Sequence, residues 1–137
     1  MKVNLELDRN MRIIANNNRG HETIFDTTEK VGGENTAATP MEVTLETLAG
    51  CSFMDVISIL RKKRKQVDNL EIEIEGERRD QHPKIFTKAH LKYKLTSPDA
   101  ELKDLERAIE LSQDKYCGVS AMFKLAGCEV TWEAEIA

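Results

Sequence analysis

The stretch that decides the fold is TPMEVTLETLAGCSFMDVISILRKKRK, residues 39 to 65. It opens with a capping pattern, because Thr39 can accept a hydrogen bond from the backbone N–H of Glu42 while the Glu42 side chain reaches back to the N–H of Thr39. Pro40 then occupies the first helical position, where no backbone donor is needed. The stretch therefore predicts a long helix from Thr39 to about Arg64.

The middle of this helix has no continuous polar face. Its apolar residues point in nearly every direction: Leu45, Leu48, Ala49, Phe53, Met54, Val56, Ile57, Ile59 and Leu60. A helix that is apolar all round has to be buried all round, and a small domain can hardly surround a helix of about 37 Å by itself. We therefore expect a second copy of the chain to cover part of it in a homodimer, the commonest kind of oligomer.

Shorter alternating segments lie on both sides of the helix and predict strands. Before the helix these are residues 2–7, 12–15 and 21–27; after it they are residues 69–77, 84–95 and 128–136. In each of the longer segments the apolar residues alternate with charged ones, which is typical of a half-buried sheet.

Two more helical segments are expected between the last two strands. Ser97 and Pro98 predict the start of a second helix, by the same cap and proline logic, which ends near Asp114. Its expected buried stripe is Leu102, Leu105, Ala108 and Ile109. A turn with a short helical piece follows at residues 115–127. This order of elements indicates a single α+β domain over residues 1–137.

Composition and charge exclude several classes of protein. The net charge of -4 comes from 24 acids and 20 bases mixed along the chain, so no strong field favours nucleic acid. The basic run at residues 61–65 is best explained by cations that oppose the dipole at the end of the helix. The start, MKVNLELDRN, lacks the pattern of a secretory signal, and no run approaches the ~20 apolar residues of a membrane span. We expect a soluble cytoplasmic protein with neither nucleic acid nor membrane as a partner.

The three cysteines, Cys51, Cys117 and Cys128, show no CxxC spacing. This pattern fits neither a disulfide framework nor a zinc site, so reduced thiols are expected. Cys51 lies in an apolar run, where free cysteine often packs as a small apolar side chain, so spacing alone favours core filling over a nucleophile. Cys117 lies outside the strong apolar pattern and fits either role. Cys128 opens a strand and is expected to be structural.

Two segments together resemble a known family. TPMEVTLETLAGCSFMDVISILRKKRK and ELSQDKYCGVSAMFK, residues 110–124, are similar to the OsmC/Ohr family of thiol-dependent hydroperoxide reductases. The most specific features are Pro40, eleven residues before Cys51, and Cys117, followed three residues later by serine. The resemblance implies the OsmC-like α+β fold, in which an antiparallel sheet packs on a long central helix and two chains form an intertwined homodimer with active sites at the interface.

The resemblance also implies a reaction on organic hydroperoxides, with hydrogen peroxide as a further substrate. The peroxidatic cysteine is then Cys51, which attacks as a thiolate and becomes a sulfenic acid. Cys117 is the resolving cysteine, and an external dithiol such as a lipoyl-bearing protein reduces the disulfide. No metal or organic cofactor is implied, and His21, His82 and His90 show no ligand spacing. The alternative is a non-catalytic module that binds an apolar ligand at the dimer interface.

Two positions depart from the family pattern. In the organic hydroperoxide branch a glutamate directly follows the proline at the helix start and pairs with an arginine from an early loop. Here Met41 holds that position, so Glu42 and Arg19 are the candidates for this pair, although capping is a sufficient reason for Glu42. The second departure is Asp55, one helical turn after Cys51, because a carboxylate on the same face disfavours an ionised thiol.

The apolar neighbours of Cys51 suggest the substrate class. We expect any cleft that reaches the thiol to be lined by Leu48, Phe53, Met54 and Val56. Burying an alkyl chain there gains ~0.8 kcal/mol per methylene. The sequence therefore predicts that organic hydroperoxides are preferred over hydrogen peroxide.

Overall fold

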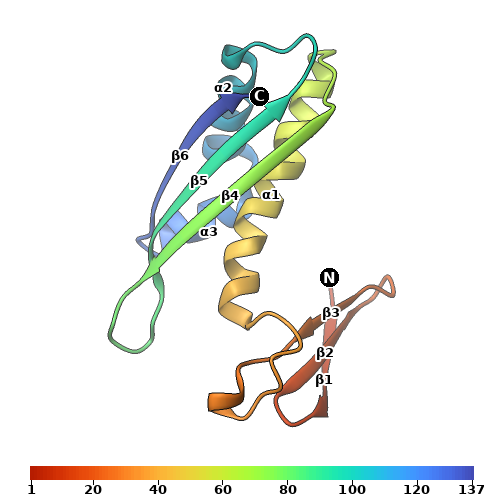
Figure 1. The fold of residues 1–137 in the computed structure, drawn as a ribbon, viewed down its shortest axis with the longest axis vertical. Helices are drawn as coiled ribbons and strands as arrows, with labels where there is room; N and C mark the ends of the chain where they lie inside the picture. The colour runs from red at the N-terminus through yellow and green to blue at the C-terminus, as the bar shows by residue number, and fades with distance from the viewer. The chain divides into compact units, whose positions relative to one another are not determined.

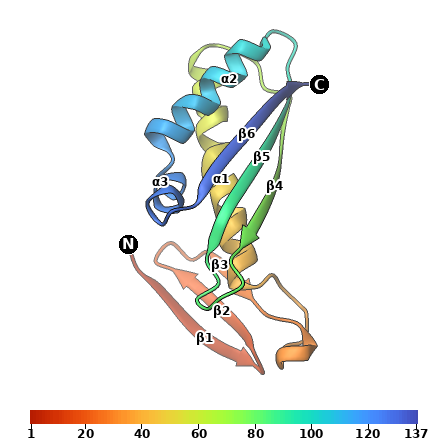
Figure 2. The same ribbon diagram turned by 90° about the vertical axis from the view of Figure 1, so that its left-hand side faces the viewer.

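The structure is a computed structural model that describes all of residues 1–137. The chain forms two compact units, residues 1–44 and residues 45–137, which are shown as ribbons in Figure 1 and Figure 2. Both contain short sheets, and the second also contains most of the helical residues. The expected α+β class is confirmed.

The first unit is built on an antiparallel sheet of three strands in the order β1-β2-β3. These strands are β1 (Val3–Arg9), β2 (Arg12–Asn17) and β3 (Glu22–Phe25), so the three early strands expected from the alternation are confirmed. The turn between β2 and β3 ends at Gly20, whose φ of 83° lies in the region that glycine adopts without steric cost.

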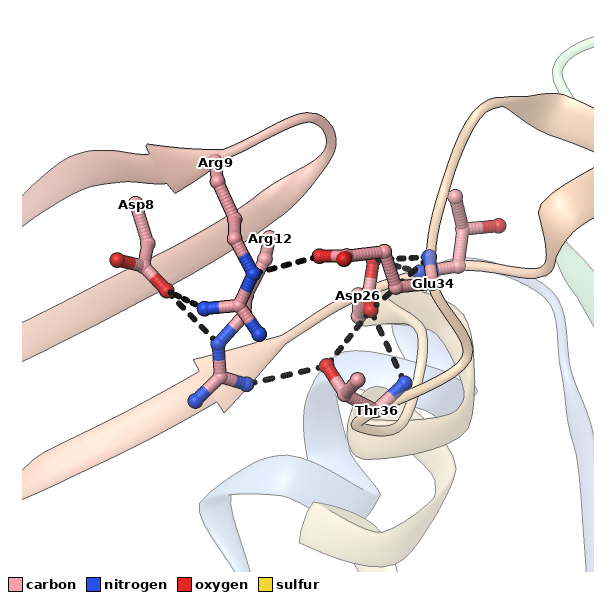
Figure 3. A network of polar contacts seen from close by, with 7 residues as sticks. Asp8, Arg9, Arg12, Asp26, Glu34 and Thr36 are labelled. Atoms are coloured by element: carbon pink, nitrogen blue, oxygen red, sulfur yellow. Dashed lines mark hydrogen bonds and ion pairs between the residues drawn. The ribbon is translucent and has the colours of Figure 1, made fainter.

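A single buried carboxylate fixes the loop that follows β3. Asp26 is only 2% exposed and accepts hydrogen bonds from the backbone N–H groups of Thr27, Glu34 and Thr36, and from the Thr36 hydroxyl at 2.7 Å. The hydrogen bond from the Thr36 backbone is the largest of the causes that lower the pKa of Asp26 from 3.8 to about 2. We call Asp26, Thr27, Glu34 and Thr36 the Asp26 cluster, of which Figure 3 labels Asp26, Glu34 and Thr36.

The β1-β2 hairpin is tied to this cluster by charged side chains (Figure 3). Arg12 donates to the Thr36 hydroxyl at 3.1 Å, and Arg9 pairs with Glu34 at 2.8 Å. Both arginines also contact one oxygen of Asp8 at 2.9 Å. The Thr36 hydroxyl thus accepts from a cation and donates to the Asp26 carboxylate, which joins the hairpin and the loop within the first unit.

The long helix α1 spans Pro40–Lys62, close to the predicted range. Its capping box is formed as expected: the Thr39 N–H donates to Glu42 Oε2 at 2.7 Å, and the Glu42 N–H donates to Thr39 Oγ1 at 3.3 Å. Beyond the other end of the helix, Lys63 and Lys65 both pair with Asp104, at 3.4 and 3.3 Å. Arg61 and Lys62 lie in the last turn of α1, where the sequence predicted cations against the helix dipole, whereas Lys63 and Lys65 form ion pairs that the sequence did not predict.

By length and composition alone, α1 can cross a membrane. Its most apolar window has a mean hydropathy of 1.5, and only 22% of that window is buried in the chain. The sequence contains no unbroken run of ~20 apolar residues, and α1 passes this test because the mean hydropathy of its window also includes uncharged polar residues. Core helices of soluble proteins pass the same test, so the finding does not by itself assign the helix to a membrane.

The second unit contains a mixed sheet in the order β4-β5-β6. Its strands are β4 (Asn69–Arg78), β5 (Phe86–Thr96) and β6 (Glu129–Ile136). β4 and β5 are antiparallel, but β6 runs parallel to β5, so the expected antiparallel sheet is corrected at this edge. The reason is the helical crossover between β5 and β6, which returns the chain to the end where β5 began.

The helices of the second unit pack together on one side of this sheet, as Figure 1 and Figure 2 both show. α1 contributes one buried residue per turn from a single face: Leu48, Ser52, Val56 and Leu60. β5 contributes every second residue: Ala89, Leu91, Tyr93 and Leu95. The buried residues thus recur every four positions in α1 and every two positions in β5, as expected of a helix face and a strand face that share one core.

The second helix begins later than the sequence predicted. α2 spans Leu102–Leu111 and is capped by Glu101, whose backbone N–H bonds Asp104 Oδ2 at 3.1 Å in a capping box. The Ser97 hydroxyl instead accepts from the Ala100 N–H at 3.0 Å in a preceding turn. Leu102 is 43% exposed because it lies in the first turn, so it was wrongly placed in the buried stripe, while the other three residues of that stripe are fully buried.

Candidate functional site

Two of the three cysteines of the chain meet in the second unit beside a carboxylate. The sulfur atoms of Cys51 and Cys117 and a carboxylate oxygen of Asp55 all lie within 4.8 Å of one another. Both thiols are free. We call these three residues the thiol site.

Local structure explains how each residue reaches the site. Cys51 and Asp55 lie one turn apart on α1, so their side chains share a face. Cys117 follows a single π-helical turn, η2 (Ser112–Tyr116), closed by a 2.7 Å hydrogen bond from the Cys117 N–H to the Ser112 carbonyl. π-helical turns are rare and often occur at functional sites.

Cys117 is also the N-cap of the short helix α3 (Gly118–Leu125). Its sulfur accepts from the backbone N–H of Ser120 at 3.3 Å. The spacing of three residues between this cysteine and the serine, noted in the sequence, is thus the spacing of a helix cap.

The three thiols differ in exposure. Cys51 is half-buried, whereas Cys117 is 3% and Cys128 is 5% exposed. Cys117 therefore belongs to the core, although its sequence neighbourhood showed no strong apolar pattern. Cys128 packs as expected of a structural residue.

The environment of Cys117 favours its protonated form. Burial is the main cause that raises the pKa of this thiol, and the neighbouring Cys51 and Asp55 raise it further, while the Ser120 N–H opposes the shift. Cys117 is therefore a neutral thiol at pH 7, next to the more exposed sulfur of Cys51.

A buried hydrogen-bond network lies behind the thiol site. The Tyr93 hydroxyl and the Ser52 hydroxyl are 2.6 Å apart, and the Gln113 amide donates to both, at 3.1 and 3.2 Å. The Gln113 carbonyl oxygen accepts from Ser120 at 2.6 Å, and Ser112 lies 2.9 Å from Ser52. We call Ser52, Tyr93, Ser112, Gln113 and Ser120 the hydroxyl network.

The hydroxyl network ends at Asp55. The Ser112 hydroxyl lies 3.0 Å from Asp55 Oδ2 and 2.9 Å from the Ser52 hydroxyl. It has only one hydrogen to donate, and a carboxylate oxygen is the stronger acceptor, so this hydrogen bond goes to Asp55. Burial is the main cause that raises the pKa of Tyr93 to about 12, so this phenol is neutral. Asp55 is thus held by a neutral network, beside the thiols and not turned away from them.

Sequence reasoning missed this network. One signal was available: Ser52 falls on the stripe of Leu48, Val56 and Leu60, where a core-facing helix position normally carries an apolar residue. Ser112 and Gln113 carried no signal, because their burial depends on the π-helical turn.

The two remaining candidates, Arg19 and Glu42, belong to the first unit. Arg19 lies in the turn after β2, where its backbone N–H donates to Asn17 Oδ1 at 2.9 Å. Glu42 is engaged in the cap of α1, and the hydrogen bond from the Thr39 backbone is the main cause that lowers its pKa. The Glu42 carboxylate bonds Thr39 and forms no ion pair with Arg19.

The apolar cleft expected beside Cys51 is only partly consistent with the structure. Leu48 and Val56 are fully buried in the core, because they share the stripe that faces the sheet, so neither can line an open cleft. Met54 is 75% exposed and lines a pocket of about 600 Å³ with Ile57 and other residues of α1. A separate pocket of about 360 Å³ reaches Asp55.

Comparison with known proteins identifies relatives of the whole chain. A family model described as "OsmC-like protein" matches residues 33–133. Protein YhfA of Escherichia coli (strain K12) is 32% identical over 126 residues, which cover 92% of this chain and 91% of YhfA.

Solved structures agree with these matches. The crystal structure of a hypothetical protein from Aquifex aeolicus VF5 is 35% identical with a TM-score of 0.82, covering 99% of this chain and 96% of that one. An organic hydroperoxide resistance protein OsmC from Legionella pneumophila, described as a predicted redox protein, is 13% identical with a TM-score of 0.67, covering 98% of this chain and 95% of that one. At that identity the likeness shows the fold alone.

Proposed function

The chain belongs to the OsmC family, and from that premise we propose that it is a dithiol-dependent hydroperoxide reductase. One observation carries the proposal: two free sulfurs from different helices lie within 4.8 Å of each other, one half-buried and one buried. The Legionella protein that shares this fold is an organic hydroperoxide resistance protein, and we propose the same substrate class for this chain.

Cys51 acts first in this proposal because it is the more accessible thiol of the pair. Its thiolate attacks the distal oxygen of the hydroperoxide, the O–O bond breaks, and an alcohol leaves with one added proton. Cys51 is then a sulfenic acid. Because Cys117 is a neutral thiol, it is a poor nucleophile toward the peroxide. It therefore reacts only after Cys51 has formed the sulfenic acid.

Cys117 acts second as the resolving thiol. It condenses with the sulfenic acid, water is released, and a Cys51–Cys117 disulfide forms. A disulfide needs an S–S distance of about 2.05 Å, so the two side chains have to move together from their separation in the reduced structure. An external dithiol, such as a lipoyl group on a carrier protein, then restores both thiols by exchange.

A homodimer is part of the proposal. α1 is apolar on most sides, yet only 22% of its most apolar window is buried within one chain. A second copy of the chain supplies the missing cover, and light scattering at micromolar concentration tests for it. A monomeric mass with native helix content contradicts this part of the proposal.

Glu42 and Arg19 enter as candidate activating residues, carried over from the resemblance. Because a glutamine can also complete a capping box, Glu42→Gln removes the charge and retains the cap. A loss of kcat/KM in Glu42→Gln and in Arg19→Gln, with unchanged helix content, supports an activating role. Unchanged kinetics in both variants assign Glu42 to the cap and Arg19 to its turn.

The test of the function is peroxide consumption with dihydrolipoamide or dithiothreitol as the electron donor. We expect turnover of cumene hydroperoxide and tert-butyl hydroperoxide, with a higher kcat/KM than for hydrogen peroxide. Equal or better use of hydrogen peroxide contradicts the preference for organic substrates. No turnover of any of them favours the alternative, a module that binds an apolar ligand, for which the pocket at Met54 is the candidate surface.

A further inference from the structure

The thiol site has a second property that hydroperoxide reduction does not require: its donor atoms can hold a metal ion. It offers two sulfurs and one carboxylate oxygen, all within 4.8 Å of one another. The cysteine spacing matches no short zinc-binding motif. The structure instead combines two donors from α1 with a third from the start of α3.

The separations suit a tetrahedral ion. With Zn–S bonds of about 2.3 Å and Zn–O bonds of about 2.0 Å, ligand atoms in a tetrahedral site lie about 3.5 to 3.8 Å apart. The two sulfurs therefore need to close by about 1.0 Å or less, and each sulfur and the carboxylate oxygen by about 1.3 Å or less, which side-chain rotation can supply. Neither α1 nor α3 has to move as a whole.

Two of the three donors are already oriented by neighbours, as ligands in metal sites usually are. Ser112 bonds one oxygen of Asp55, Oδ2, and leaves the other for an ion. The backbone N–H of Ser120 points at the sulfur of Cys117, a contact that stabilises a thiolate once an ion has displaced its proton.

The charge of the site also favours a cation. The aspartates Asp104 and Asp114 in the same unit pair with lysines, whereas Asp55 bonds only the neutral Ser112. Lys62 and Lys63 line the pocket that reaches Asp55, yet Lys63 is paired with Asp104 and neither forms an ion pair with Asp55. The carboxylate therefore faces the two sulfurs with no side-chain cation bound to it.

We propose that the reduced protein binds one zinc ion per chain through Cys51, Cys117 and Asp55, and that oxidation of the two thiols releases it. Thiolate donors select soft or borderline ions such as Zn²⁺ over Mg²⁺ and Ca²⁺. The fourth position remains for a water molecule, which can enter from the pocket of about 360 Å³ beside Asp55. In this state the ion holds a lone pair of the Cys51 sulfur, so zinc slows the attack of Cys51 on a peroxide but does not abolish it.

The release step balances without a further reactant. Two zinc-bound thiolates give up two electrons and form a disulfide, and the hydroperoxide takes those electrons together with two protons from the solvent to become an alcohol and water. The zinc ion, which has lost two of its three protein ligands, leaves unchanged in oxidation state. Only this peroxide-driven step rests on the proposed function, since zinc binding itself does not.

The test begins with fully reduced protein titrated with Zn²⁺ against a chromophoric chelator. We expect one ion per chain. Cys51→Ser and Cys117→Ser should each weaken binding at least a hundredfold, and Asp55→Asn at least about tenfold. Cys128→Ser and Asp114→Asn are the matched controls and should bind as the unaltered chain does. Circular dichroism verifies that each variant is folded.

A spectroscopic measurement on the unaltered chain tests the zinc site even if a variant fails to fold. Cd²⁺ in place of Zn²⁺ gives a sulfur-to-metal charge-transfer band, whose intensity in the unaltered chain should correspond to two thiolates per ion. Binding that is unaffected by Asp55→Asn, or a band that reports a single thiolate, overturns the three-residue site. No binding by the reduced, unaltered chain overturns the proposal altogether.

Oxidation separates this proposal from the proposed function. Diamide, which oxidises dithiols without a peroxide, should release the zinc, and cumene hydroperoxide should do so too. Release by diamide but not by the hydroperoxide sustains the zinc site and contradicts the reductase. Peroxide turnover by a protein that never binds zinc supports the reductase and contradicts the zinc site.

Discussion

The two units of this chain each contain a buried polar centre, but of opposite kinds. In the first unit the centre is a charged group, Asp26, which accepts from three backbone N–H groups and a hydroxyl. In the second unit it is the neutral hydroxyl network around Gln113, with no ionised member. Both centres satisfy their buried donors and acceptors, so each holds its surroundings in one arrangement.

The difference determines how the stability of each unit depends on pH. A centre built on a carboxylate depends on pH, whereas one built on hydroxyls and an amide does not. The network beside the thiol site is therefore neutral, and burial raises the pKa of its phenol, Tyr93, to about 12. The neutral network can therefore support redox chemistry without changing its own charge.

The largest expected effect concerns the thiols of the second unit. Cys51→Ser should lower peroxide turnover by at least about a thousandfold, because it removes the nucleophile. Cys117→Ser should leave a sulfenic acid at Cys51 that dimedone traps. Cys128→Ser should retain activity. If Cys128→Ser is folded and as inactive as Cys51→Ser, the assignment of roles is wrong.

The neutral centre can be broken without touching a thiol. Tyr93→Phe removes one hydroxyl and leaves Ser52 and Gln113 short of a partner, so we expect a loss of about 1 to 3 kcal/mol in the free energy of unfolding. Tyr116→Phe is the matched control, because Tyr116 is 54% exposed, and it should change stability little. Urea unfolding followed by circular dichroism measures both. Equal effects of the two substitutions would count against a network that stabilises the core.

Acid should distinguish the two centres. The pKa of Asp26 in the folded state, about 2, lies below its ordinary value of 3.8, so its stabilising contribution is present above pH 4 and is lost as the pH falls through 2. Amide hydrogen exchange in β1, β2 and β3 should therefore accelerate over this range more than exchange in β5.

Asp26→Asn sharpens this prediction. The variant should exchange faster in the first unit already at neutral pH and should lose the acid dependence there, while exposed Asp80→Asn should change neither. An acid dependence in β1 to β3 that persists in Asp26→Asn contradicts the role given to this carboxylate.

The smallest effect is expected at the cap of α1. Thr39→Ala removes the hydroxyl that accepts from the Glu42 N–H at 3.3 Å and should cost about 1 kcal/mol of stability. Thr36→Ala serves as a comparison, since it removes a hydroxyl from the Asp26 cluster and should act on the acid response as well. Thermal unfolding near pH 7 and near pH 2 separates the two, because the contribution of Asp26 is lost between its ordinary pKa of 3.8 and about 2.

Sequence periodicity predicted most of the fold because the elements are locally encoded. The Thr39–Glu42 box and the alternation in β5 depend only on neighbours in the chain, and both are present. The start of α2 was predicted too early because two possible N-caps, Ser97 and Glu101, lie four residues apart. The helix begins after Glu101, which forms a capping box with Asp104. The parallel pairing of β6 depends on the path of the crossover, which no local pattern reports.

The candidate site was predictable only in part. Cys51 and Cys117 were singled out by resemblance, and the i, i+4 spacing placed Asp55 beside Cys51. The burial of Cys117 and the inward position of Gln113 were not predictable, since both follow from a single π-helical turn. The cleft residues Leu48 and Val56 were misassigned because a helix that is apolar all round does not reveal which face meets its own sheet.

The most direct measurement of the central claim is the mass of the oxidised protein after one equivalent of cumene hydroperoxide, followed by peptide mapping without reductant. The account predicts the loss of two hydrogens per chain and a single linked peptide pair that contains Cys51 and Cys117, reversible by dihydrolipoamide. An unreacted protein, or a disulfide that involves Cys128, would contradict it.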